Sequence, residues 1–430
     1  MATVIWQGDA VDIAQISTVT LGGAWLANDT ITLTISDKQL TLTIGATVDI
    51  PTILDNLVIM VSGTGDFGTG YSSNALGDAV GEFAELTASE DDATVLTLTA
   101  NTAGTLHTLT SSRVTASTGT IADATTTANG SKNDWNNVDN WDTGVVPVAT
   151  DAVIFQNNDV PVKFGLNQSA VTLASLTIRQ SYTGEIGLPE TNAEGSISYD
   201  EYRGTFLQIA TAIVEQGQGE GTGSGRIKID SGTTSPVAIT VTNTGSAVDT
   251  DLGAFIWKGT GANVDFVIRE GSVGLGVLEA DTAVIDQLDI VDATVIHFQG
   301  TVANIFINGT GSLDITGEIT GGLTLKGAGT ANVRGLIPGA GTGFVLEQGT
   351  INVSSPTDVL ITLTIFGGAI ADFSKALGVI TVTNEVSLHP GGSLLDPLGN
   401  LVFTNDIKII GGSLSEVTLD LGKDRVVGVT

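Results

Sequence analysis

The feature that most constrains this chain is a short repeat in its second half. A glycine or aspartate, a small residue and then alternating apolar residues recur about every 20 residues. The repeats begin at Gly271, Asp292, Gly311, Gly329, Gly349, Gly368, Gly392 and Gly412. Short strands with glycine corners at this period suit the coils of a parallel β-helix, because inward apolar residues of successive coils stack into one core. A β-sandwich is the alternative, but it requires more Asn-Gly and Asp-Gly turns than we find.

The composition agrees with many short strands. Of the 430 residues, 41% are hydrophobic and only 15% are charged, and the 55 glycines follow no Gly-X-Y period. Threonine, valine and isoleucine are frequent, and β-branched side chains favour strands. We therefore predict a mainly β protein with a small α+β N-terminal domain followed by a parallel β-helix, or solenoid.

The N-terminal unit, residues 1–118, is predicted to be a small α+β attachment domain. Apolar residues alternate with threonine over residues 31–35 and 40–44, which indicates a β-hairpin. Residues 51–58 have the spacing of one amphipathic helix, and further strands are expected at 82–88, 95–100 and 106–111. We expect the helix to pack on one antiparallel sheet. Residues 119–133 have almost no large apolar side chains and are predicted to be a linker.

The stretch from Trp135 to Phe155 follows this linker and contains a second tryptophan, Trp141. The open end of a solenoid exposes apolar core and unpaired strand edges, which bulky aromatic residues can cover. We therefore interpret Trp135, Trp141 and Phe155 as a structural cap. A loop with two packed indoles and a sugar-stacking platform are the alternatives. Residues 134–270 are predicted to contain this cap and irregular first coils with insertions, and residues 271–430 the regular coils.

Candidate chemistry is sparse. Tyrosines and carboxylates gather in one segment and form the weak candidates for a glycan site: Tyr182, Glu185, Tyr199, Asp200 and Tyr202. Paired carboxylates there would suit a glycoside hydrolase or lyase, although an acidic chain brings such residues together by chance. Asp286, Asp289 and Asp292 are weak candidates for calcium ligands, and a solvated face is the simpler interpretation. His107, His297 and His389 are isolated. We expect no catalytic residues, no metal and no cofactor.

The charge balance excludes some partners. The formal net charge is −31, so the chain should repel nucleic acid and anionic membranes. It contains no cysteine, which excludes disulfides. The first residues lack the basic and apolar segments of a signal peptide, and no apolar run is long enough for a transmembrane segment. We expect a protein made in the cytoplasm without either segment.

Two parts of the sequence carry a resemblance to known proteins. Residues 22–25 (Gly-Gly-Ala-Trp), 28–35 (Asn-Asp-Thr-Ile-Thr-Leu-Thr-Ile) and 103–109 (Ala-Gly-Thr-Leu-His-Thr-Leu) occur in an order that resembles a small domain of tailed-phage virion proteins. The stretch from Trp135 to Phe155 resembles the start of autotransporter-like bacterial β-solenoids.

These resemblances imply a non-enzymatic structural protein of a tailed bacteriophage or prophage virion. It would be exposed on the particle as capsid decoration, or cement, or as a tail fibre or spike. The family also implies a homo-oligomer, most often a trimer, in contact with other virion proteins. Two alternatives are a tailspike that binds or degrades a host surface polysaccharide and a bacterial surface adhesin. Neither nucleic acid nor a membrane is an expected partner.

Overall fold

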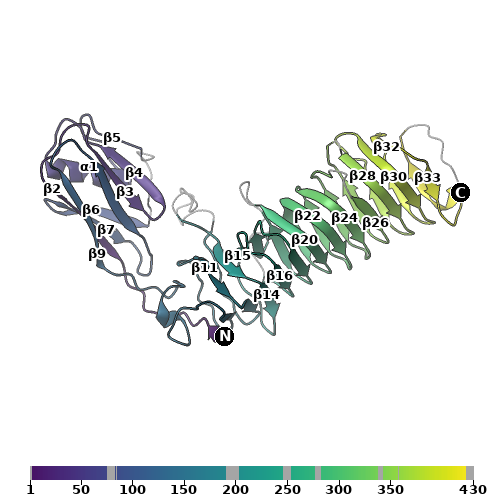
Figure 1. Ribbon diagram of the computed structural model, residues 1–430, viewed down its shortest axis with the longest axis horizontal. Helices are drawn as coiled ribbons and strands as arrows, with labels where there is room; N and C mark the ends of the chain where they lie inside the picture. The colour runs from purple at the N-terminus through teal and green to yellow at the C-terminus, as the bar shows by residue number, and fades with distance from the viewer. Residues whose placement is uncertain are drawn as a thin grey trace.

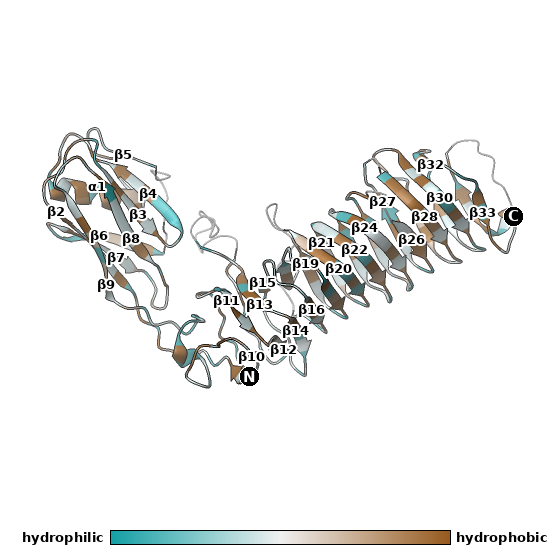
Figure 2. Cartoon of the chain, in the orientation of Figure 1, coloured by the Kyte–Doolittle hydropathy of each residue, from teal (hydrophilic) through white to brown (hydrophobic). Residues whose placement is uncertain are grey.

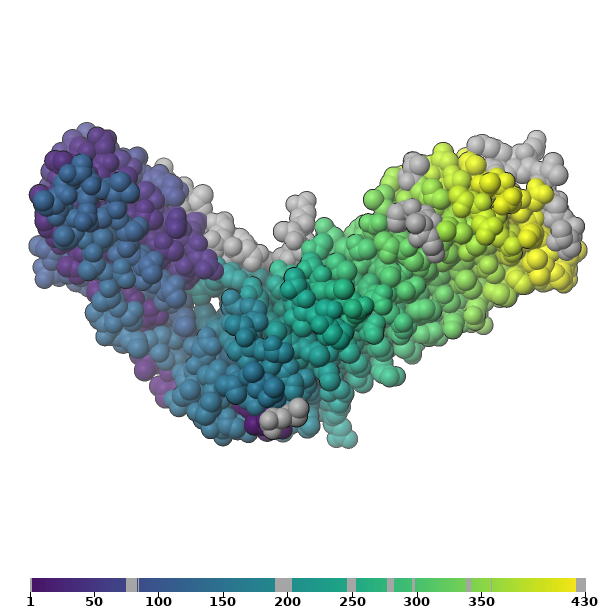
Figure 3. Space-filling model, viewed as in Figure 1, coloured from purple at the N-terminus to yellow at the C-terminus, as the bar shows by residue number. Residues whose placement is uncertain are grey.

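The computed structural model describes residues 2–74, 83, 85–189, 203–245, 253–276, 282–337, 342–356 and 358–422. They form a small domain and a long solenoid, two arms that meet at an elbow (Figures 1 and 3). Each arm has its own hydrophobic core: one cluster runs from Val4 to Leu421 and the other is confined to the small domain. The predicted fold class, a mainly β chain with a parallel β-helix, is confirmed.

The solenoid consists of two long parallel sheets. The first contains β1 (Thr3–Ile5), β10 (Ala152–Phe155), β12 (Ser175–Arg179), β14 (Ile213–Gln218), β16 (Val237–Val241), β18 (Val264–Ile268), β20 (Ala283–Ile290), β22 (Gly300–Ile307), β24 (Glu318–Leu325), β26 (Gly343–Leu346), β28 (Asp358–Ile365), β30 (Ile380–Leu388) and β32 (Leu401–Phe403), with β33 (Ile407–Ile409) also beside β30. The second contains β11 (Asn167–Leu173), β13 (Leu207–Thr211), β15 (Ile227–Asp230), β17 (Phe255–Lys258), β19 (Ser272–Leu275), β21 (Thr294–Phe298), β23 (Ser312–Ile315), β25 (Thr330–Val333), β27 (Thr350–Val353), β29 (Ile370–Asp372), β31 (Ser393–Leu395) and β34 (Thr418–Asp420).

The register explains the sequence repeat. Leu313, Ala331 and Ile351 are direct neighbours on successive strands of the second sheet, and all three are buried. Their chain neighbours point outward because side chains alternate along a strand. Figure 2 shows hydrophobic residues along the strands of both arms. With thirteen strands in line and about 4.8 Å between neighbours, the first sheet is about 58 Å long.

Two details of the repeat differ from the prediction. The first coils, which we expected within residues 134–270, also include β1, so the parallel ladder begins at residue 3 and continues through β10. The final repeat, at Gly412, forms the short 3-10 helix η3 (Leu414–Glu416), and the last strand, β34, follows it. Glu416 bonds back to the backbone and the hydroxyl of Ser413, which favours a helical turn over a strand at this point.

The small domain contains two antiparallel sheets rather than the single sheet that we expected. One has the order β6 (Leu86–Asp92), β7 (Val95–Ala100), β2 (Ile16–Gly22) and β9 (Thr120–Thr127). The other has the order β5 (Ser72–Ser73), β4 (Lys38–Thr43), β3 (Thr30–Ile35) and β8 (Leu109–Val114). Helix α1 (Ile50–Ser62) packs against β4, β6 and β7. Asp49 caps its first turn, and Gly63, with φ of 64°, ends it in the left-handed conformation.

Both predicted boundaries of this domain were wrong. Residues 3–5 do not belong to it, because β1 pairs in parallel with β10 of the solenoid. The predicted linker, 119–133, is instead largely a strand, because β9 pairs along its length with β2. The side chains of β9 are mostly exposed, so backbone hydrogen bonds rather than apolar burial hold it in place. The domain is therefore an insertion between the first and second strands of the solenoid ladder.

Candidate functional site

The elbow begins with an aromatic cluster inside the first coil. Trp6, Trp135, Trp141 and Phe155 are all buried. The ring centroids of Trp135 and Trp141 are 4.8 Å apart at an interplanar angle of 70°, and Phe155 lies 5.9 Å from Trp6 and 6.0 Å from Trp135. Edge-to-face packing of this kind adds stability beyond the burial of area. The cluster lies where the solenoid core would otherwise be open.

Two of the indoles are also fixed by hydrogen bonds. Trp6 Nε1 donates to the carbonyl oxygen of Val160 over 3.0 Å, and Trp141 Nε1 donates to that of Trp135 over 2.8 Å. We did not predict from the sequence that Trp6 belongs to the cap. The feature that could have indicated it is the apolar segment of residues 3–6, Thr-Val-Ile-Trp. This segment repeats the pattern of residues 152–155, Ala-Val-Ile-Phe, which is its partner in the ladder.

Tyr182 belongs to the same core, so its candidacy as a glycan-stacking residue was wrong. Its side chain is fully buried beside Phe155, and its hydroxyl donates to the carbonyl oxygens of Val160 and Glu185. Burial and the nearby charges of Glu185 and Asp159 raise the pKa of this phenol well above its usual value. The side chain of Glu185 is exposed, and Tyr199, Asp200 and Tyr202 lie outside the described residues.

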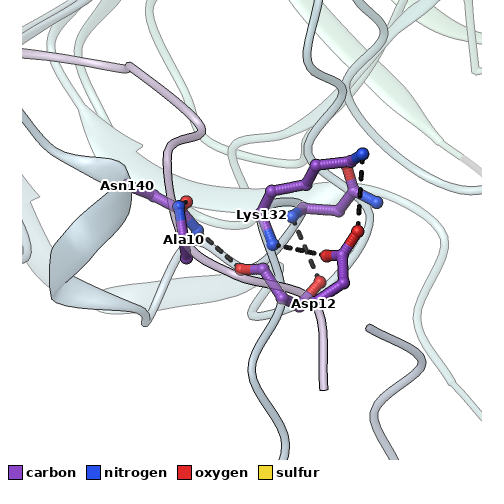
Figure 4. A network of polar contacts seen from close by, with 6 residues as sticks. Ala10, Asp12, Lys132 and Asn140 are labelled. Carbon is purple, nitrogen blue, oxygen red and sulfur yellow. Dashed lines mark hydrogen bonds and ion pairs between the residues drawn. The ribbon is translucent and has the colours of Figure 1, made fainter. Parts of the chain in front are cut away.

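The chain crosses the elbow twice, once on each side of the inserted domain, and the two crossings are bonded together (Figure 4). Asn140 is fully buried; its Oδ1 accepts from the N–H of Ala10, and its Nδ2 donates to the carbonyl oxygens of Ser131 and Asp134. Asp12 accepts from the backbone N–H of Lys132 and forms an ion pair of 3.4 Å with its ammonium. The domain is thus held by two bonded segments rather than by one flexible linker.

A third link joins the arms away from these crossings. Arg203 of the solenoid and Glu85 of the inserted domain form an ion pair of 3.0 Å, in which both side chains are nearly buried. The guanidinium carbon of Arg203 also lies 5.4 Å from the ring centroid of Phe164. A buried pair of this kind loses much stability if only one partner is removed, since the other charge stays desolvated.

A cleft of about 370 Å³ lies between the arms next to this ion pair. The inserted domain contributes residues 36–37 and 106–108, and the solenoid contributes residues 136, 163–167, 203–204, 206 and 208. His107 lines the cleft although its side chain is buried, and neither ring nitrogen has a hydrogen-bond partner among the described residues. Burial, and next the positive charge of Arg203, lower the pKa of His107 to about 4. The imidazole is therefore neutral near pH 7.

The structure does not bring the calcium candidates together into a site. Asp286 and Asp289 lie on β20, and Asp292 lies in the turn that follows it. Asp292 accepts from the backbone N–H and hydroxyl of Thr310 on the next coil, and Asp289 accepts from Gln287. Across the described ranges no cluster of three potential metal ligands occurs. His389 stacks on Phe366 at a centroid distance of 4.2 Å, and the His297 side chain is not described.

No helix among the described residues is long and apolar enough to cross a bilayer. Comparisons of the chain with protein-family models, with curated proteins and with solved structures gave no match.

Proposed function

We propose that this chain is a non-enzymatic structural protein displayed on the surface of a tailed-bacteriophage particle. The inserted domain attaches it to the particle, and the solenoid projects as a decoration or spike. The observation that carries the proposal is the bonded double crossing at the elbow. Two segments connect the domain to the solenoid, and Asn140 forms hydrogen bonds with both of them. A domain connected in this way can transmit force to a rod that has one continuous core. A domain on a single linker would swing freely.

The surface suits a particle exposed to solvent. The net charge of −31 keeps such proteins soluble and disfavours contact with nucleic acid. Outward positions of the second sheet form rows of small polar side chains, such as Ser312, Thr330 and Thr350, which lie in register. These rows of polar side chains keep the sides of the solenoid in contact with water.

As part of this proposal, the chain associates with itself, as a trimer, and with other virion proteins. The last coils support self-association, because several large apolar side chains there are exposed, among them Leu377, Leu398, Val402 and Leu414. Light scattering of the purified chain would measure this directly. A monomer at micromolar concentration would contradict the trimer.

The test of the function is particle association. Particles purified from cells that produce the chain should contain it in fixed stoichiometry, as measured by mass spectrometry. Because Ile13 N donates to Gly130 O over 2.7 Å, a short Gly-Ser loop can replace residues 14–129. This variant should keep the circular-dichroism signal of the solenoid but no longer join the particle.

The other outcomes separate the alternatives. If the chain is absent from all particles, the proposal is wrong, and retention on the bacterial surface would then favour an adhesin. If particles lose their ability to release reducing sugar from host polysaccharide when the chain is deleted, the chain is a depolymerising tailspike. If the variant without the domain still joins the particle, attachment lies in the solenoid.

A further inference from the structure

The cleft between the arms has the dimensions of a small-molecule site. Its volume of about 370 Å³ falls in the range of about 300–1,000 Å³ that is typical of such sites. Its walls come from two separate hydrophobic units, and domain interfaces are frequent locations of ligand sites. Leu106, Phe164 and Leu166 supply apolar lining between the polar groups.

The backbone around His107 is held in place by Gln15. Gln15 clamps the backbone on both sides: its Oε1 accepts from His107 N over 3.2 Å, and its Nε2 donates to His107 O over 2.5 Å. The side chain is 4% exposed, and within the described part of the chain neither ring nitrogen has a hydrogen-bond partner. Leaving a buried polar group unsatisfied costs stability, so such a group calls for an explanation. A bound ligand that accepts from one nitrogen and donates to the other would remove this cost.

Lys163 and Asp37 both line the cleft beside Arg203. The Lys163 ammonium forms no ion pair with any residue that the structure describes. The backbone beneath it is fixed, since Lys163 N and Phe164 N both donate to the carbonyl oxygen of Asn133. In a chain with 47 acidic and 16 basic residues, a single unpaired cation in a cleft favours a ligand with one negative charge. A dianion would meet more repulsion from the surrounding acidic surface.

Amide groups complete a lining that is rich in donors. Asn136 Oδ1 accepts from Gln168 Nε2 over 3.0 Å, which fixes the orientation of its NH₂ group. Gln208 and Asn167, which are partners on neighbouring strands, also line the cleft. Gly165, with φ of 65°, also lines the cleft, and a Cβ there would be 2.5 Å from Asp134 Oδ1. The left-handed backbone and this close approach both favour glycine at this position.

We propose that this cleft binds a small hydroxylated carboxylate with the size and chemistry of a single sugar acid. The carboxylate pairs with Lys163, and hydroxyl groups bond to His107 and to the amide of Gln208. The ligand is either a free sugar acid or one uronic-acid unit of a polysaccharide. The inference goes beyond attachment to a particle and does not depend on it, because the purified chain suffices for the test.

The experiment is calorimetric titration of the purified full chain with D-glucuronate and D-galacturonate. Glucose, acetate and inorganic phosphate serve as comparison ligands, and tetragalacturonate represents the polysaccharide. We expect at least one uronate to bind more tightly than glucose, acetate and phosphate. Tighter binding of tetragalacturonate than of the monomer would identify a polysaccharide as the source; equal or weaker binding would identify the free sugar acid.

Matched variants locate the site. Lys163→Gln should weaken uronate binding at least tenfold, which is the effect expected for a lost bond to a charged group. Lys408→Gln removes an exposed cation on the last coils and should leave the affinity unchanged. Imidazole chemical shifts of His107, followed by NMR, should move on uronate addition while those of His389 stay constant. The inference is overturned if neither uronate binds at millimolar concentration, if glucose or phosphate binds as tightly, or if Lys163→Gln binds normally.

Discussion

Trp6 and Trp141 pack edge to face, with ring centroids 5.0 Å apart and 74° between their planes, although the whole inserted domain separates them in the chain. The backbones of the two residues also form a β-bridge. The first coil is therefore closed by two segments that lie on either side of the inserted domain in the sequence. They can meet only after the chain of that domain has been synthesised. The first strand of the solenoid, the aromatic cap and the connection to the inserted domain therefore form one structural unit.

Removing the Trp6 side chain should destabilise the solenoid rather than the inserted domain. Trp6→Ala deletes a fully buried ring, and such substitutions cost about 3–5 kcal/mol. Hydrogen exchange with mass spectrometry should show faster exchange in β10 and β12. Trp25→Ala is the control, because Trp25 is buried in the core of the inserted domain and should loosen that domain only. Unchanged exchange in β10 after Trp6→Ala would contradict the role of Trp6 in the cap.

The side chain of Asn140 should contribute far more to the stability of the elbow than the ion pair between Asp12 and Lys132. Asn140→Ala leaves the N–H of Ala10 and two carbonyl oxygens without their partner in a buried site, which we expect to cost about 3 kcal/mol. Lys132→Ala removes an exposed ion pair and should cost at most about 1 kcal/mol. Limited proteolysis should cut the Asn140 variant near residues 128–134 and spare the Lys132 variant. Equal cleavage of both would show that the bonded crossing does not depend on Asn140.

The stability of the inserted domain should fall between pH 6.5 and 4 because of His107. The pKa of His107 is about 4 in the folded chain, against an ordinary value of 6.5, so in this window the unfolded chain binds a proton that the folded chain does not. The free energy of unfolding should drop by about 3 kcal/mol on acidification across this range. His107→Gln should abolish that part of the pH dependence. An NMR titration that places the pKa of His107 near 6.5 would refute the prediction.

Substitutions of adjacent residues on one strand should differ sharply in how much they destabilise the solenoid. On β26, Phe344 points into the core and Val345 points outward. Phe344→Ala should cost about 3–5 kcal/mol, whereas Val345→Ala should cost no more than about 0.5 kcal/mol. Urea unfolding monitored by circular dichroism measures both. A similar loss in both variants would argue that the outer face carries packing of its own.

The solenoid could be predicted from the sequence because each coil repeats the same local rule. Leu313, Ala331 and Ile351 occur at one point of the repeat, and that point is buried in each coil. The pattern is local in sequence, so no knowledge of distant contacts is needed. The hairpin β3–β4 and helix α1 could be predicted for the same reason, because the alternation of the hairpin and the helical spacing after Pro51 each lie within a few residues.

The elbow could not be predicted because its contacts join distant parts of the chain. A three-strand ladder of β1, β10 and β12 requires the chain to return to its first residues, and the pattern that residues 3–6 share with residues 152–155 is too short to specify that partner. Strand β9 was missed because its small polar side chains carry no burial pattern. The cleft at His107 depends on how the two arms are placed, which only the tertiary structure determines.

The proposed display on a particle is tested most directly by imaging antibody fragments bound to its two ends. One fragment would recognise the turn between β6 and β7 in the inserted domain, and the other the exposed turn at Gly367 and Gly368, between β28 and β29 in the last coils of the solenoid. In cryo-electron micrographs of purified particles, the Gly367 fragment should bind and lie farther from the particle surface than the first. Binding of the domain fragment farther out, or of neither fragment to any particle, would contradict the account.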